Sequence, residues 1–221
     1  IRDRDVTGVQ TCALPILMIT LDDNIVFDEE KTYLKNEIVR NGSFPVYHTT
    51  SYWELSRYDL FTHTLLNKNY SDVNVPIEQR INSDYFYFFY NIFNRFCDKH
   101  NYKVKKIIRS CVNINFHIND LKNFDPHTDH DYDHNVFLLY LNDLPYDINY
   151  NSTIVYNQTY VDFGLGLIEN ENIELNNKLT VLDEVYPKEG RCICFPGNFH
   201  AIKNTSPNTL RYVCVFTFIK G

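Results

Sequence analysis

Residues 126–142 read PHTDHDYDHNVFLLYLN, a polar run rich in metal-ligating side chains followed directly by an apolar segment. The apolar part, 135–142, has the length and composition of a buried β-strand. In an extended chain residues i and i+2 point to the same side, so His127 and Asp129 can reach one ion at the strand mouth. The spacing alone is weak, because 8 His and 28 acidic residues among 221 give about one such triplet by chance.

A second imidazole and an arginine follow later in the chain. His200 comes just after the turn at 196–197, and Arg211 opens another apolar segment. Two imidazoles and one carboxylate form the ligand set that holds non-haem Fe(II) with open positions. An arginine that points inward from an apolar strand needs an anionic partner, which a dicarboxylate would provide. The alternative is an outward Arg211 paired with a surface acid. The short polar turn between the two segments predicts a hairpin that places Arg211 beside His200.

The periodicity of apolar residues changes along the chain. Helical spacing predicts helices over 28–40, 52–66 and 83–100, and the last carries an aromatic stripe suited to packing on a sheet. Alternating or continuous apolar runs predict strands over 103–116, 135–142, 153–160, 179–185, 190–196 and 210–219. Helices first and short strands later indicate an α+β fold. We expect one domain over 18–221, with a helical part at 18–102 and a β part at 103–221.

Composition narrows the class of partner. The net charge of −7 argues against an obligatory nucleic-acid partner, since phosphate binding needs a basic surface. The one dense basic run, Lys103, Lys105, Lys106 and Arg109, is interpreted as a solvated helix end or strand edge. No segment has the apolar length of a membrane span.

The six cysteines show no metal-binding or redox spacing. Cys192 and Cys194 would share one face of a strand as packed thiols, which fits a reducing cytoplasm. Residues 1–17 differ in composition from the rest and resemble translated sequencing-adapter sequence, so we expect a non-native extension and a native start at Met18. The alternative is a signal peptide, which the interrupting Pro15 and the missing cleavage site disfavour.

Five blocks in order carry a resemblance to a known family: PHTD at 126–129, FLLYLND at 137–143, STIVY at 152–156, VYPKEGRCICFPGNFHAI at 185–202 and LRYVCVFTF at 210–218. Residues 124–218 resemble the Fe(II)/2-oxoglutarate-dependent oxygenases, in particular the prolyl-hydroxylase-like branch with its bacteriophage and marine bacterial relatives. The resemblance implies a double-stranded β-helix, a jelly-roll or cupin-like barrel, buttressed by N-terminal helices. It also implies Fe(II), 2-oxoglutarate and O2 as cofactor and cosubstrates.

The resemblance implies a role for each matching residue. His127, Asp129 and His200 would bind the iron, and Arg211 would hold the distal carboxylate of 2-oxoglutarate. Tyr140 matches a strand tyrosine that contacts the cosubstrate in this branch, and a core tyrosine is an equal alternative. A carboxylate ligand implies hydroxylation, because the halogenases of the superfamily replace it with a small residue.

The chain departs from the family pattern at two places. Residues 146–152 replace a glycine-rich turn, and Val213 stands where several relatives carry Ser or Thr, so a secondary hydrogen bond to 2-oxoglutarate is in doubt. The remaining ligand-type residues of 130–134 are expected to line the cleft mouth, with a second metal site as the alternative.

The overall prediction is a dioxygenase that hydroxylates a peptidyl residue or a small molecule. The alternatives are a non-catalytic cupin-like metal-binding or structural barrel, such as a phage-associated protein, and a Zn²⁺- or Mn²⁺-dependent hydrolase built on 127–134.

Overall fold

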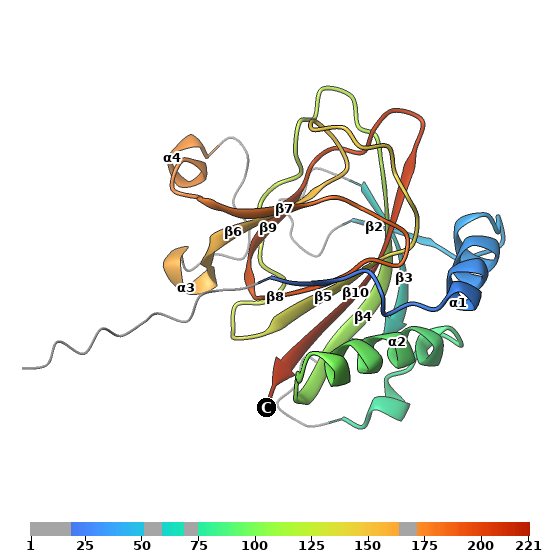
Figure 1. Ribbon diagram of the computed structural model, residues 1–221. Coiled ribbons are helices and arrows are strands. Elements are labelled where there is room, and N and C mark those ends of the chain that lie inside the picture. The colour runs from blue at the N-terminus through green and yellow to red at the C-terminus, as the bar shows by residue number, and fades with distance from the viewer. Residues whose placement is uncertain (1–18, 51–58, 69–74, 164–171) are drawn as a thin grey trace, which may run out of the picture.

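The computed structural model describes residues 19–50, 59–68, 75–163 and 172–221. Strands in these residues form two antiparallel sheets that lie face to face (Figure 1). The large sheet has the order β1-β8-β5-β10-β4-β3-β2, and the small sheet has the order β7-β6-β9. The architecture is α+β with a jelly-roll core, as the sequence predicts.

The strands of the large sheet are β1 (Thr20–Asp22), β2 (Tyr47–Thr50), β3 (Asp59–Leu66), β4 (Val104–Phe116), β5 (Asn135–Tyr140), β8 (Cys192–Pro196) and β10 (Leu210–Lys220). The small sheet consists of β6 (Thr153–Thr159), β7 (Val181–Val185) and β9 (Asn198–Ile202). The helices are α1 (Asp28–Tyr33), which continues as the π-helix η1 (Leu34–Val39), the 3-10 helix η2 (Ile77–Gln79), α2 (Phe86–Lys99), and the short α3 (Tyr160–Phe163) and α4 (Ile173–Asn176).

Side-chain alternation along the large sheet separates two apolar layers. On β10, Phe216 and Phe218 join the cluster that packs against α2, whereas Val213 and Val215 join the cluster between the sheets. Phe93 of α2 stacks on Phe216 with ring centroids 4.7 Å apart. The aromatic stripe of α2 therefore covers the outer face of the sheet (Figure 1), as predicted.

The small sheet is covered in the same way. Ile154 of β6 and Phe199 of β9 pack against Phe163 of α3 and Leu175 of α4 on its outer face. Val155 points the other way and packs in the cluster between the sheets. Because neighbours in a strand alternate, every second residue of β6 and β9 faces the large sheet.

The six predicted strands are all present, and the predicted helices at 28–40 and 83–100 correspond to α1 with η1 and to α2. The helix predicted over 52–66 is wrong in its second half, because 59–66 forms β3 and pairs with β4. Residues 52–58 lie outside the described residues. His63 explains the error, because it is a polar residue on the buried face of this strand and so hides the period of two. Its ring is buried and bonds to the carbonyl of Pro45 and the hydroxyl of Ser83, each at 2.7 Å. Strands β1, β2 and β9 were not predicted.

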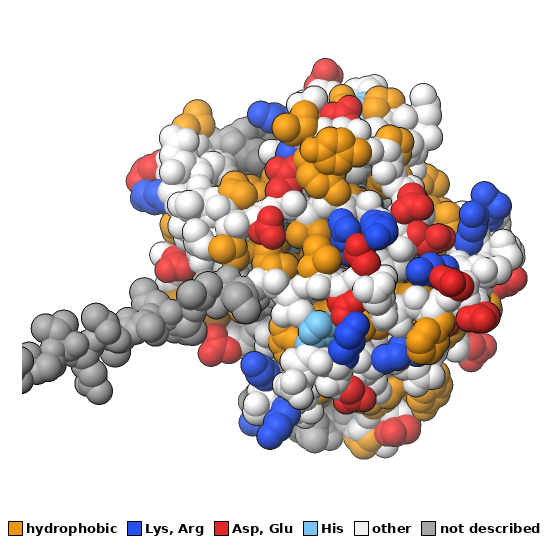
Figure 2. All heavy atoms as spheres, viewed as in Figure 1, with side chains coloured by type: hydrophobic (Ala, Val, Ile, Leu, Met, Phe, Trp, Pro, Cys, Tyr) orange, Lys and Arg blue, Asp and Glu red, His pale blue; other side chains and the backbone are white. Residues whose placement is uncertain are grey.

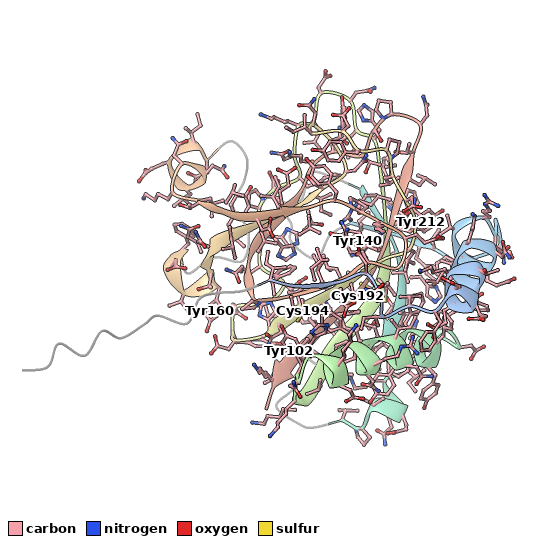
Figure 3. The ribbon with its side chains drawn as sticks, viewed as in Figure 1. Tyr102, Tyr140, Tyr160, Cys192, Cys194 and Tyr212 are labelled. Carbon is pink, nitrogen blue, oxygen red and sulfur yellow. The ribbon has the colours of Figure 1, made fainter. Side chains whose placement is uncertain are left out.

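The packed-thiol prediction for the strand cysteines is confirmed. Cys192 and Cys194 are free, fully buried and part of the cluster under α2, and Figure 3 shows both on the α2 side of the large sheet. Cys12 lies outside the described residues. In the described part of the chain no helix is long and apolar enough to cross a membrane. On the face in Figure 2, Lys and Arg side chains are interspersed with Asp and Glu, and no continuous basic patch is visible there.

Candidate metal and cosubstrate site

Three ligand-type side chains converge between the sheets. His200 lies on β9, and a two-hydrogen-bond bridge joins it to the loop that carries His127: each residue's N–H donates to the other's carbonyl, at 3.0 and 2.9 Å. Asp129 follows in the same loop, and its Oδ2 is 3.8 Å from Nε2 of His200. One ligand atom from each of the three residues lies within 4.8 Å of the others. The structure therefore brings the predicted triad together.

Backbone carbonyls orient both imidazoles. Nδ1 of His127 lies 3.1 Å from the carbonyl oxygen of Asp125, and Nδ1 of His200 lies 3.1 Å from that of Asn198. A ring nitrogen facing a carbonyl must carry the proton, so each Nε2 keeps a lone pair available for a metal ion. Burial lowers the pKa of His200 to about 4 and keeps that ring neutral at physiological pH.

Asp129 is a buried carboxylate that remains ionised. Burial by itself would raise its pKa, but opposing interactions, the largest of them with the charge of Arg109, hold the pKa well below its usual range. Oδ1 accepts a hydrogen bond from Nη2 of Arg109, whereas Oδ2 is buried and has no hydrogen-bond partner in the described part of the chain. An anionic oxygen left unpaired between imidazole nitrogens fits a divalent cation.

Arg211 is also buried without an acid. Its side chain is 1% exposed, and among the described residues no carboxylate pairs with it. Nη1 donates to Oδ1 of Asn115 at 3.2 Å, Nη2 donates to Oγ1 of Thr153 at 2.8 Å, and Nε has no partner. The outward-facing alternative is thus wrong. The predicted hairpin is wrong as well, since His200 and Arg211 lie on strands of opposite sheets.

Tyr140 lies next to this guanidinium. Its hydroxyl donates to Oγ1 of Thr153 at 2.8 Å, and its ring centroid is 5.2 Å from Cζ of Arg211. Burial raises the pKa of the Tyr140 phenol, so the hydroxyl keeps its proton as a donor. Figure 3 shows Tyr140 between the two sheets. Arg211, Tyr140 and Thr153 together form a cationic, donor-rich end of the intersheet space.

The remaining ligand-type residues of the polar loop differ in exposure. Asp131 and Asp133 are exposed, whereas His130 and His134 are 3% and 4% exposed, so the two histidines do not make the contact with solvent that was one of their predicted roles. Nε2 of His130 pairs with Oγ1 of Thr217 at 2.9 Å, and Nδ1 of His134 pairs with the carbonyl of Tyr132 at 2.7 Å. Neither joins a group of three metal-ligating residues in the described part of the chain.

Sequence reasoning missed three polar partners of the site: Arg109, Asn115 and Thr153. Arg109 belongs to the basic run interpreted as solvated, yet it pairs with Asp129 inside the site. The usable signal was the period of two along β4, which places residues 109, 111, 113 and 115 on one face.

No protein-family model and no curated protein matches the chain. Solved structures match most of it. One is an oxidoreductase of the 2OG-Fe(II) oxygenase family from Burkholderia pseudomallei (TM-score 0.55, 13% identity, 90% of this chain and 84% of that one). The fold is that of the 2OG-Fe(II) oxygenases.

Two further members of this fold have ligands named with them. A prolyl hydroxylase from Trichoplax adhaerens, in complex with a hypoxia-inducible-factor peptide fragment, matches with TM-score 0.53 and 14% identity over 91% of this chain and 83% of that one. HygX from Streptomyces hygroscopicus, with nickel, 2-oxoglutarate and hygromycin B bound, matches with TM-score 0.51 and 12% identity over 91% and 82%. At these identities the likeness concerns the fold.

Proposed function

We propose that the protein is an Fe(II)- and 2-oxoglutarate-dependent dioxygenase that hydroxylates a peptidyl residue or a small molecule. One observation carries the proposal: the region between the two sheets contains both a two-histidine, one-carboxylate cluster and a buried arginine that has no acidic partner among the described residues. In the cluster, Oδ2 of Asp129 has no hydrogen-bond partner among the described residues, and a divalent metal would bind there. A dicarboxylate would supply the acidic partner of Arg211.

His127, Asp129 and His200 would hold the metal through Nε2, Oδ2 and Nε2. The two backbone carbonyls that accept from Nδ1 fix the rings, so the ligand geometry exists before the metal arrives. With 2-oxoglutarate, Fe(II) supplies the activation of O2 for insertion of oxygen into a C–H bond. Because Asp129 is a carboxylate rather than a small residue, the proposed outcome is hydroxylation.

Arg211 would bind the distal carboxylate of 2-oxoglutarate, with Tyr140 and Thr153 as hydroxyl donors. A guanidinium fork matches a carboxylate, and its unpaired Nε offers a further donor. Thr153 supplies the hydroxyl that Val213 lacks, since its Oγ1 already meets both Arg211 and Tyr140. In this proposal, the hydroxyl of Thr153 on the facing sheet would compensate for the departure at Val213.

The substrate class follows from the fold's known range. The matched structures include one with a peptide and one with the small molecule hygromycin B, so both classes belong to the proposal. The described cysteines are buried free thiols, and we propose a reducing compartment such as the cytoplasm.

The test is spectroscopic. Adding Fe(II) and 2-oxoglutarate anaerobically to the purified protein should produce the weak visible charge-transfer band of a chelated 2-oxoglutarate. His127→Ala and His200→Ala should abolish the band, whereas His100→Ala, which changes a histidine paired with Asp22 outside the site, should keep it. On admission of O2, succinate should form.

Two other outcomes would favour the alternative functions. No band with the wild type contradicts the proposal and favours a non-catalytic barrel. Hydrolytic activity with Zn²⁺ or Mn²⁺ that ignores 2-oxoglutarate would favour the hydrolase alternative.

A further inference from the structure

Arg109 extends from β4 to the carboxylate of Asp129. Its Nη2 donates to Oδ1, and its Nη1 lies 3.5 Å from Sγ of the buried Cys111. The Asp129 side chain is 5% exposed and that of Arg109 28%. Since β4 pairs with β3 on one side and β10 on the other, the backbone that carries this guanidinium is held in the middle of the large sheet.

The two oxygens of Asp129 have different surroundings. Oδ1 is occupied by Arg109, whereas Oδ2 is buried, lacks a hydrogen-bond partner and lies 3.8 Å from Nε2 of His200. Rotation that offered both oxygens to an ion at the histidines would break the bond to Arg109. In this geometry Oδ1 of Asp129 is bonded to Arg109, and Oδ2 is left to bind the metal.

We propose that Arg109 is a positioning residue that holds Asp129 as a one-oxygen metal ligand and so keeps the other coordination positions open. The inference rests on the metal-binding half of the proposed function. Two imidazoles and one oxygen fill half of an octahedron and leave room for a chelating cosubstrate and O2. A carboxylate that bound through both oxygens would take one of those positions.

Two effects of Arg109 on metal affinity oppose each other. Its positive charge repels a dication nearby, which weakens binding, while its hydrogen bond fixes the carboxylate and strengthens binding. Loss of a partner that orients a metal ligand commonly costs about 10–100-fold in affinity. We therefore expect orientation to dominate, because Asp129 is buried and Arg109 is the side chain that the structure shows donating to it.

The experiment measures Co²⁺ binding to the full chain without 2-oxoglutarate, by calorimetry and by the visible spectrum of the bound ion. Arg109→Gln keeps a donor without charge, Arg109→Lys keeps charge without the fork, and Arg109→Met removes both. Lys105→Gln is the matched control, since it removes a charge from an exposed position of the same strand. We expect affinity to fall about 10–100-fold in Arg109→Met, less in the other two, and not in Lys105→Gln.

The spectrum separates positioning from a structural role. Two-oxygen coordination by Asp129 would change the ligands and the geometry around Co²⁺ and therefore its visible absorption, which a merely destabilised protein would not show. Unchanged affinity and spectrum in Arg109→Gln and Arg109→Met, or tighter binding, would overturn the inference. An equal loss in Lys105→Gln would also overturn it, because the loss would then not be specific to the side chain that bonds to Asp129.

Failure of the proposed function is a different result. If the wild type binds no Co²⁺, or binds it equally well after His200→Ala, the metal site itself is absent. If Arg109→Met does not fold, thermal denaturation will show it, and the Gln and Lys variants carry the test.

Discussion

At the scale of single residues, the site is built from buried charges whose partners lie on other strands. Asp129 is compensated on one oxygen by Arg109, and Arg211 has only the neutral oxygens of Asn115 and Thr153. A buried charge without a counter-ion costs several kcal/mol, on the order of 3–5 when a pair is broken. Such a residue is retained when a ligand supplies the missing charge.

Arg211→Met should therefore weaken ligand binding without lowering the stability of the ligand-free protein. We expect the Kd for 2-oxoglutarate, measured by calorimetry with Co²⁺ present, to rise about 100-fold or more, because a buried charge-assisted contact is worth roughly 2–5 kcal/mol. The melting temperature of the ligand-free protein should change little or rise, since an unpaired buried cation is removed.

Arg191→Met is the matched control. Arg191 forms a two-bond ion pair with Asp23 outside the site, at 2.7 and 3.0 Å. Its loss should lower the melting temperature and leave 2-oxoglutarate affinity unchanged. The reverse pattern in the two variants would remove Arg211 from the cosubstrate site.

At the scale of elements, side-chain alternation gives the two faces of each strand different neighbours. The outer face of the large sheet packs on α2, and the inner face carries polar partners at both ends of an apolar middle. Strand β1 is the short edge strand of this sheet, and it pairs with β8. The residue after it, Asp23, ties it to Arg191 and Lys188.

This anchor predicts a pH dependence. Hydrogen bonding to Arg191 first, and then to Lys188, lowers the pKa of folded Asp23 to about 2 from 3.8. The unfolded chain takes up the proton at the higher pH, so the stabilisation is complete above about pH 4 and is lost as the pH falls toward 2.

Asp23→Asn should cost about 1–2 kcal/mol at pH 7, after allowing for solvent screening. Chemical denaturation of wild type and variant between pH 2 and 7 measures the difference. A gap between the two that stays constant down to pH 2 would contradict the assignment.

At the scale of the whole molecule, the site joins the two sheets. His200 comes from the small sheet, Arg109 and Arg211 come from the large one, and the loop with His127 and Asp129 bridges to β9. A ligand that contacts all of them binds only the folded arrangement. Metal and cosubstrate should therefore stabilise the entire fold.

Excess Co²⁺ and 2-oxoglutarate should raise the melting temperature, with a gain of about 2.7 kcal/mol at a ligand concentration 100 times Kd. Chelation of the metal should reverse the shift. In His200→Ala the shift should disappear, and a shift of equal size in that variant would place the stabilising ion elsewhere.

The sequence by itself determined six of the strands, the aromatic helix α2 and the candidate triad, because these follow from periods of two and 3.6 residues and from a short motif. Only the tertiary structure decided that 59–66 is a strand, that Arg109 meets Asp129, and that Thr153 and Asn115 meet Arg211. Those last two contacts span 58 and 96 residues of chain. A local pattern reports which face a side chain occupies, whereas its partner depends on how the sheets are ordered and placed against each other.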